Sequence, residues 1–176
     1  MKRLTLLRHA NADWKDSRTA DFDRPLNRKG VSESTAMAKR LFERELIPEF
    51  ILASPAVRAQ QTTEIFMREL EIPLRKLRRD ERLYLARPED ILEAIRATGP
   101  RISHLMVVGH NPGLTDLARR LTPDPALEEM PTASICTMVF DVRAWVDLIP
   151  GQARAVECEA PKGGFGFWSA LSTRAR

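Results

Sequence analysis

The sequence has no apolar run that approaches the roughly 20 residues of a membrane-spanning helix. The run that follows Lys2 and Arg3 is also too short for the apolar core of a signal peptide. The chain contains no internal repeat and no low-complexity segment. These absences speak against a membrane protein, and we expect a cytoplasmic protein with no membrane partner.

Cysteine is scarce, since Cys136 and Cys158 are the only two in 176 residues. Two cysteines do not make the disulfide framework of a small secreted domain. Both fall in segments that we expect to be strands, so we predict buried free thiols. The length suits one domain with a substantial core, and no boundary is visible, so we expect a single domain over residues 1–176.

Aromatic residues are few, and none alternate with the densest group of basic residues. The net charge is +4, and acidic residues are interleaved along the chain. A nucleic-acid surface would need basic residues that are not interleaved with acidic ones, so we expect no nucleic-acid partner. The excess charge would attract anionic substrates. The basic cluster, to which we assign no role, comprises Arg75, Lys76, Arg78, Arg79 and Arg82.

Short apolar runs alternate with helical patterns, which is typical of an α/β fold. Val31, Met37, Ala38, Leu41 and Phe42 recur at helical spacing and should face the sheet. We expect strands at residues 4–7, around 74–77, and at 50–53, 104–109, 135–142 and 153–159, the last of the chain. We expect helices from the N-cap Asn27 to about Leu46, after the N-cap Ser54, from Pro88, and after Pro112.

Four segments of the chain stand apart from this alternation. The polar segment 11–27 is long for a connection in a compact domain, and such loops are often functional. The proline-rich segment 122–132 should be a surface loop, and 145–151 a connector. We assign no role to the tail after Pro161.

Polar side chains able to do chemistry follow three of the expected strands. Arg8 and His9 end the first strand, Arg58 comes shortly after the second, and His110 follows the run 104–109. If these strands are parallel, their carboxyl ends share one edge, where open α/β sheets bind ligands. Guanidinium groups hold phosphate in a bidentate fork, and a neutral imidazole can attack phosphorus. Each residue alone could equally be a solvated side chain at a strand or helix end.

These positions carry a resemblance to a known family. Leu7-Arg8-His9-Ala10 resembles the Arg-His-Gly signature of the histidine phosphatase superfamily, also called phosphoglycerate mutase-like. Residues 53–62 resemble its second block, Ser-Pro-x-x-Arg-x-x-x-Thr, and residues 108–112 resemble its third. Arg24-Pro25-Leu26 followed by Gly30 is similar to the SixA branch, the phosphohistidine phosphatases. The resemblance covers residues 3 to 160 and implies a three-layer α/β/α sandwich with a mostly parallel central sheet.

The resemblance also implies roles for four residues. His9 would be the nucleophile and form a phosphohistidine intermediate, while Arg8 and Arg58 hold the phosphoryl oxygens and His110 donates to them. No metal and no cofactor would be needed, because the two arginines supply the positive charge. The expected partner is a phosphorylated substrate, such as a histidine-phosphorylated signalling or phosphotransfer protein. Phosphate or sulfate should bind in the same pocket.

One part of the family pattern is missing. Larger members carry a glutamate general acid two residues after the leucine of a Leu-Tyr strand end, where this sequence has Leu85. Glu81, a little upstream, is the candidate substitute or simply a solvated neighbour of Arg79. Imidazole leaves phosphorus more readily than an alkoxide does, so the gap favours phosphohistidine as the substrate. Two alternatives stay open: a small-molecule phosphomonoesterase and a non-catalytic module that binds anions or nucleic acid.

Overall fold

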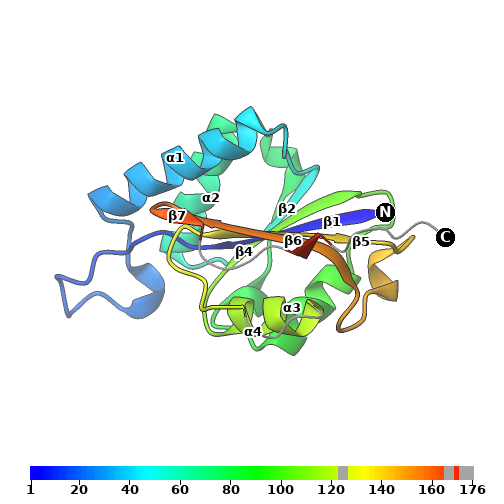
Figure 1. The fold of residues 1–176 in the computed structure, drawn as a ribbon. Helices are drawn as coiled ribbons and strands as arrows, with labels where there is room; N and C mark the ends of the chain where they lie inside the picture. Colours follow the sequence, from blue (N-terminus) through cyan, green and yellow to red (C-terminus); the bar gives the residue numbers. More distant parts are fainter. Residues whose placement is uncertain (123–126, 165–168, 171–176) are drawn as a thin grey trace.

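The computed structural model describes residues 1–122, 127–164 and 169–170. A central sheet lies between two pairs of helices, with α1 and α2 on one face and α3 and α4 on the other (Figure 1). The helices span Arg28–Glu43 (α1), Val57–Glu69 (α2), Pro88–Arg96 (α3) and Gly113–Leu121 (α4). No helix in the described ranges is long and apolar enough to cross a bilayer.

The sheet combines a parallel half with an antiparallel half. Its strand order is β3-β2-β4-β1-β5-β6-β7, and β8 pairs with β6. Strands β3, β2, β4 and β1 are parallel to one another, whereas β5 is antiparallel to β1 and β6 is antiparallel to β5. The predicted α/β sandwich is therefore confirmed. The strands span Lys2–Arg8 (β1), Phe50–Ala53 (β2), Leu77–Arg79 (β3), His104–Gly109 (β4), Ile135–Phe140 (β5), Ala153–Ala160 (β6), Gly163–Gly164 (β7) and Ser169–Ala170 (β8).

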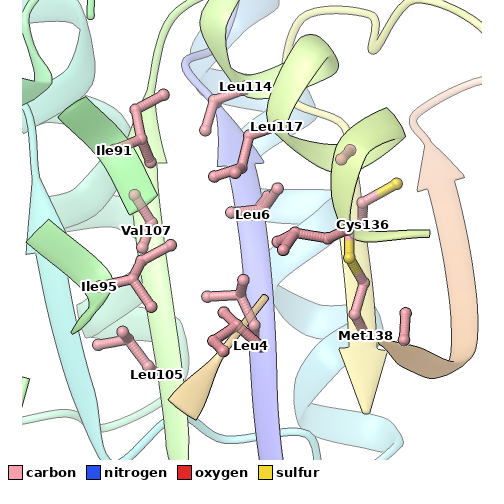
Figure 2. Close-up of a cluster of buried hydrophobic side chains, with 14 of the residues drawn as sticks. Leu4, Leu6, Ile91, Ile95, Leu105, Val107, Leu114, Leu117, Cys136 and Met138 are labelled. Atoms are coloured by element: carbon pink, nitrogen blue, oxygen red, sulfur yellow. The ribbon is translucent and has the colours of Figure 1, made fainter. Parts of the chain in front are cut away.

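Two buried clusters hold the three layers together. In β4, Leu105 and Val107 pack toward α3 and α4, whereas Met106 and Val108 pack toward α1 and α2. This alternation follows from the strand pleat, and it explains why residues 105–108 of β4 are all apolar. Figure 2 shows the first cluster, in which side chains of β1 and β4 meet Ile91, Ile95, Leu114 and Leu117.

Helix α1 begins as predicted but buries a different stripe. Asn27 is its N-cap, and the Asn27 side chain accepts a hydrogen bond from the Gly30 amide (2.8 Å). Met37, Ala38 and Leu41 are buried, but Val31 and Phe42 are 45% and 47% exposed, so this part of the prediction was wrong. The helix ends at Glu43, before the expected Leu46. The buried residues of α1 are Gly30, Ser34, Met37, Ala38 and Leu41. The first of them is a glycine, and the backbone of Asn11 packs closely against it.

Several other boundaries differ from the sequence-based expectations. β3 begins only at Leu77, because residues 74–76 form the 3-10 helix η2. β5 stops at Phe140, and β6 is not the last strand, since β7 and β8 pair with it. In the expected surface loop 122–132, residues 123–126 lie outside the described part, while Leu127 and Met130 are buried in the core beside α4. The expected connector 145–151 likewise buries Trp145 completely.

The two cysteines form a disulfide, so the prediction of free thiols was wrong. Their burial was predicted correctly, since Cys136 is 0% and Cys158 is 5% exposed. The antiparallel register of β5 and β6 sets the two residues directly opposite each other, with their Cα atoms 4.1 Å apart. The bond therefore joins neighbouring strands of the antiparallel half of the sheet.

Gly30 couples the start of α1 to the segment that follows His9. A Cβ at this position would collide with the backbone carbonyl oxygen of Asn11. We therefore expect Gly30→Ala to destabilise the fold by about 1–3 kcal/mol, as overpacking does elsewhere. Thermal denaturation measures the effect. Gly99→Ala is the matched control, because nothing lies within 4 Å of a Cβ there; equal stability of the two variants would contradict the close approach.

Candidate active site

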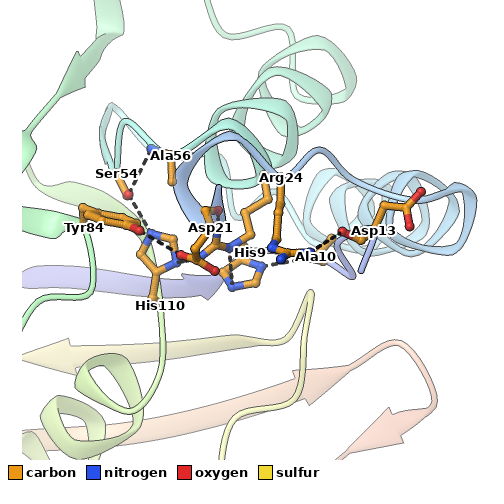
Figure 3. Close-up of polar contacts among 10 residues, drawn as sticks. His9, Ala10, Asp13, Asp21, Arg24, Ser54, Ala56, Tyr84 and His110 are labelled. Carbon is orange, nitrogen blue, oxygen red and sulfur yellow. Dashed lines mark hydrogen bonds and ion pairs between the residues drawn. The ribbon is translucent and has the colours of Figure 1, made fainter. Parts of the chain in front are cut away.

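The carboxyl ends of three strands meet at one edge of the sheet, and polar side chains gather there (Figure 3). His9 follows β1 directly, and its amide donates to the Gly109 carbonyl at the end of β4 (3.0 Å). His110 is the next residue after β4, and Arg58 lies in the first turn of α2. Four side chains were predicted to converge, and the structure links three of them, His9, Arg58 and His110, by hydrogen bonds. The fourth, Arg8, is bonded elsewhere.

His9 is held in one tautomer. Its Nδ1 lies 2.8 Å from the Ala10 carbonyl oxygen, which only accepts, so Nδ1 carries the proton. The opposite nitrogen, Nε2, then carries the lone pair, which accepts a hydrogen bond from Arg58 Nε (3.3 Å). Burial lowers the pKa of His9 to about 4, and the charges of Arg58 and Arg8 add to this effect. The imidazole is thus neutral at pH 7, as a nucleophile must be.

His110 is oriented from both sides. Its Nδ1 accepts from Arg58 Nη2 (3.4 Å), so Nε2 carries the proton and donates to the Ser54 hydroxyl (2.7 Å). Burial lowers the pKa of His110 to about 3, helped by His9 and Arg58. The His9 and His110 rings lie 5.0 Å apart. Both imidazoles therefore face the same guanidinium in their neutral forms.

Arg58 is the centre of these contacts and is only 3% exposed. Four of its five N–H bonds have partners among His9, His110 and Asp21. Asp21 takes two of them: its backbone carbonyl accepts from Nη1, and its Oδ2 accepts from Nη2 at 3.0 Å. Asp21 begins the 3-10 helix η1, Asp21–Asp23, within the long loop 11–27.

Asp21 and Tyr84 are two site residues that the sequence analysis did not single out. The Tyr84 hydroxyl donates to Asp21 Oδ2 (2.8 Å), and its ring packs edge-on against His110 (5.5 Å between centroids). Burial and the bond to Asp21 raise the pKa of Tyr84. Burial would raise the pKa of Asp21 as well, but the hydrogen bonds from Tyr84 and Arg58 together outweigh it, and that pKa is lowered. Asp21 is thus a carboxylate and Tyr84 a phenol at neutral pH.

Arg8 is turned away from this group. Its Nη1 donates to the Met130 carbonyl (2.6 Å) and lies 3.4 Å from Glu129 Oε1. Its Nε is buried without a hydrogen-bond partner. The side chain lines a cleft of about 310 Å³ together with Asn111, Pro112, Thr115, Asp116, Arg119 and Glu129.

Three further predictions concern neighbouring residues. Ser54 is not the N-cap of α2, which begins at Val57 after Ala56; its hydroxyl holds His110 instead. Glu81 is exposed at the start of the 3-10 helix η3, Glu81–Leu83. His104 lies at the other end of β4, where its Nε2 is 2.9 Å from the Thr5 hydroxyl, as suits the structural role we expected. The described residues hold no group of three or more side chains suited to a metal ion.

Comparisons with known proteins identify the family. The model of the histidine phosphatase superfamily (branch 1) matches residues 4–84. An uncharacterized protein of Mycobacterium tuberculosis, Rv1276c, is 32% identical over 165 residues, which cover 89% of this chain and all of that protein. SixA from Agrobacterium tumefaciens is 30% identical with a TM-score of 0.71, over 81% of this chain and 94% of that one. The chain belongs to the histidine phosphatase superfamily.

The 30% identity to SixA from Agrobacterium tumefaciens places the chain in the SixA-type branch of this superfamily. The protein histidine phosphatase SixA, solved in complex with tungstate, has a TM-score of 0.77 at 24% identity, over 91% of this chain and 97% of that one. The mycobacterial glucosyl-3-phosphoglycerate phosphatase Rv2419c has a TM-score of 0.62 at 18% identity, over 86% and 96% of the two chains. At these identities both likenesses show the fold alone, and a shared fold by itself does not choose a substrate.

The buried imidazoles make stability depend on pH. The pKa is lowered to about 4 for His9 and His104 and to about 3 for His110, below the 6.5 of a free imidazole. Between pH 6.5 and 4 the unfolded chain binds more protons, so stability is lost as the pH falls through this window. We expect the melting temperature to fall from pH 6.5 to 5, above the main range of carboxylate titration. The fall should be smaller in His110→Asn; a flat profile would contradict buried neutral histidines.

Proposed function

We propose that this protein is a protein phosphohistidine phosphatase that works through a covalent phosphohistidine on His9. The observation that carries the proposal is the state of His9: a buried, neutral imidazole whose Nε2 lone pair faces Arg58 at 3.3 Å. The guanidinium beside this nitrogen is placed to bind the phosphoryl oxygens, and the lone pair is free for in-line attack once the Arg58 N–H has left it.

In the first step, His9 Nε2 attacks phosphorus and the bond from phosphorus to the leaving group breaks. Arg58 exchanges its contacts with His9 Nε2, Asp21 and His110 for phosphoryl oxygens, which frees the Nε2 lone pair, and His110 lies beside those oxygens. Arg8 contributes its unpartnered Nε and the charge of its guanidinium. In the second step, water attacks phosphorus, His9 leaves with its electron pair, and phosphate carries the protons of the water away.

Charge neutralisation in this scheme comes from the chain itself. The phosphoryl group meets Arg58, which is buried beside His9, and Arg8, whose charge is felt at His9. Phosphoryl transfer needs positioning and neutralisation of the oxygens more than covalent assistance. We therefore propose a metal-independent, cofactor-free hydrolase formed by one domain.

Two features favour a protein-borne phosphohistidine. The position of the family's glutamate is occupied by Leu85, which is 56% exposed. This position therefore supplies no general acid to protonate a leaving group. The connection from α2 to β3 is short and contains only η2, which leaves no length for a lid. A site without a lid from this connection suits a substrate carried on a folded partner. The likeness to SixA supports the same substrate class. The cytoplasmic location stays a prediction.

The first test compares the wild type with His9→Ala. We expect wild type to release phosphate from a phosphohistidine protein faster than from a panel of sugar phosphates, nucleotides and alkyl phosphates. Brief incubation with labelled phosphodonor should leave an acid-labile label on His9. His9→Ala should lose at least about 1,000-fold in kcat/KM, because the nucleophile is gone.

His104→Gln is the control, since it removes a buried imidazole far from the site. Faster turnover of a metabolite than of phosphohistidine would favour the small-molecule phosphatase. Unchanged hydrolysis by His9→Ala would refute the nucleophile, and absence of any turnover would leave an anion-binding module.

The second test concerns Arg8, which must leave Glu129 or use its free Nε to reach a phosphoryl group. If it does so, Arg8→Ala should lower kcat/KM by about 100-fold, as removal of one charged donor does in other enzymes. Arg119→Ala removes an arginine from the same cleft and should change kcat/KM less than threefold. Equal effects of the two variants would show that Arg8 acts only through the general field of the cleft.

A further inference from the structure

Asp21 is the most exposed of the side chains that are hydrogen-bonded around Arg58. His9, Arg58 and His110 are 8%, 3% and 2% exposed, whereas the Asp21 side chain keeps 40% of its surface in solvent. A leaving group that belongs to another protein must lie on the solvent side of the phosphoryl group. Because Asp21 is bonded to Arg58, it is one guanidinium away from the attacking nitrogen of His9. The leaving group therefore departs past Asp21.

The group at this exit is an acceptor of hydrogen bonds and not an acid. The pKa of the Asp21 carboxyl is lowered, so it is ionised at neutral pH. The proton of Tyr84 is committed to Asp21 Oδ2 (2.8 Å), and the pKa of Tyr84 is raised. A carboxylate has room for about four hydrogen bonds, so Tyr84 and Arg58 leave capacity for a further donor. Tyr84 holds the carboxylate in place when Arg58 turns to a phosphoryl group.

An acceptor at the exit discriminates between leaving groups. An alkoxide needs a proton as its bond to phosphorus breaks, and a carboxylate both fails to supply one and repels the developing negative charge. The ring of phosphohistidine can carry the proton itself, because its nitrogen that is not phosphorylated becomes an N–H when the ring is protonated. A hydrogen bond from that N–H to a carboxylate favours the protonated ring, which leaves as neutral imidazole.

We propose that Asp21 is a specificity-determining residue that accepts a hydrogen bond from the distal N–H of the substrate imidazole. The assignment rests on the proposed function, which it deepens. As His9 Nε2 bonds to phosphorus, the bond from phosphorus to the substrate nitrogen breaks and its electron pair stays on the ring. The distal proton remains where it was, so the ring departs neutral and no proton is transferred in this step.

The test uses Asp21→Asn, with Asp21→Glu to restore the carboxylate and Asp23→Asn as the matched control. Asp23 lies on the same 3-10 helix but is exposed, and its replacement makes the same change of charge. The substrates are a phosphohistidine peptide and p-nitrophenyl phosphate, whose leaving group has no N–H and needs little help. Binding of inorganic phosphate, measured by calorimetry, reports separately whether Arg58 stays in position.

We expect Asp21→Asn to lower kcat/KM for the phosphohistidine peptide by about 10- to 100-fold, the effect of a lost charged hydrogen bond. For p-nitrophenyl phosphate it should change less than threefold, and phosphate binding should not weaken. The alkaline limb of the phosphohistidine pH profile should move down by about one unit, since the distal nitrogen loses its anionic partner. Asp21→Glu should recover part of the loss, and Asp23→Asn should resemble wild type.

Two outcomes would overturn the assignment. An equal loss on both substrates together with weaker phosphate binding would mean that Asp21 only positions Arg58. A gain on both substrates would mean that Asp21 only competes with the phosphoryl group for Arg58. In either case the wild type still hydrolyses phosphohistidine, so the proposed function survives; a wild type that does not hydrolyse it would refute both.

Discussion

Arg58 is the group on which the rest of the site depends. A guanidinium stays charged when it is buried, unlike an imidazole, so neighbouring acceptors or an opposite charge must stabilise it. Asp21 supplies a carboxylate, and His9 and His110 supply lone pairs. The same positive charge adds to burial in lowering the pKa of both imidazoles. This buried cation thus helps burial to keep the nucleophile neutral, and it provides the donors that phosphoryl oxygens require.

The contacts seen in the structure also show what substrate binding must exchange. Buried polar groups are costly without partners, and most of the site's donors and acceptors are satisfied by one another. A phosphoryl group takes over the N–H bonds that Arg58 now gives to Asp21 and His110. The buried Nε of Arg8 is the exception, since it has no partner and is free to meet an anion. The contacts that hold His9 and His110 at the ends of the strands are therefore kept when substrate binds, whereas the contact of Arg58 with Asp21 in the loop is exchanged.

Much of the fold follows from local sequence patterns. Residues 105–108 are all apolar because both faces of β4 are covered, and Asn27 caps α1 as its side chain chemistry predicts. The predictions failed where burial depended on close approach of another segment. Val31 and Phe42 have the right spacing but lie beside the buried stripe, which runs through Gly30 and Ser34 because the backbone at Asn11 comes close.

The sequence by itself determined the α/β class and the meeting of His9, Arg58 and His110, because each of these residues follows a strand and parallel strands end at one edge. Only the tertiary structure decided that Asp21 and Tyr84 complete the site, that Ser54 holds His110, that Arg8 turns to Glu129 and that Cys136 pairs with Cys158. These contacts join residues far apart along the chain, and they depend on strand order, register and loop path. Periodicity and capping report only on neighbours along the chain, so they carry no signal for such pairs.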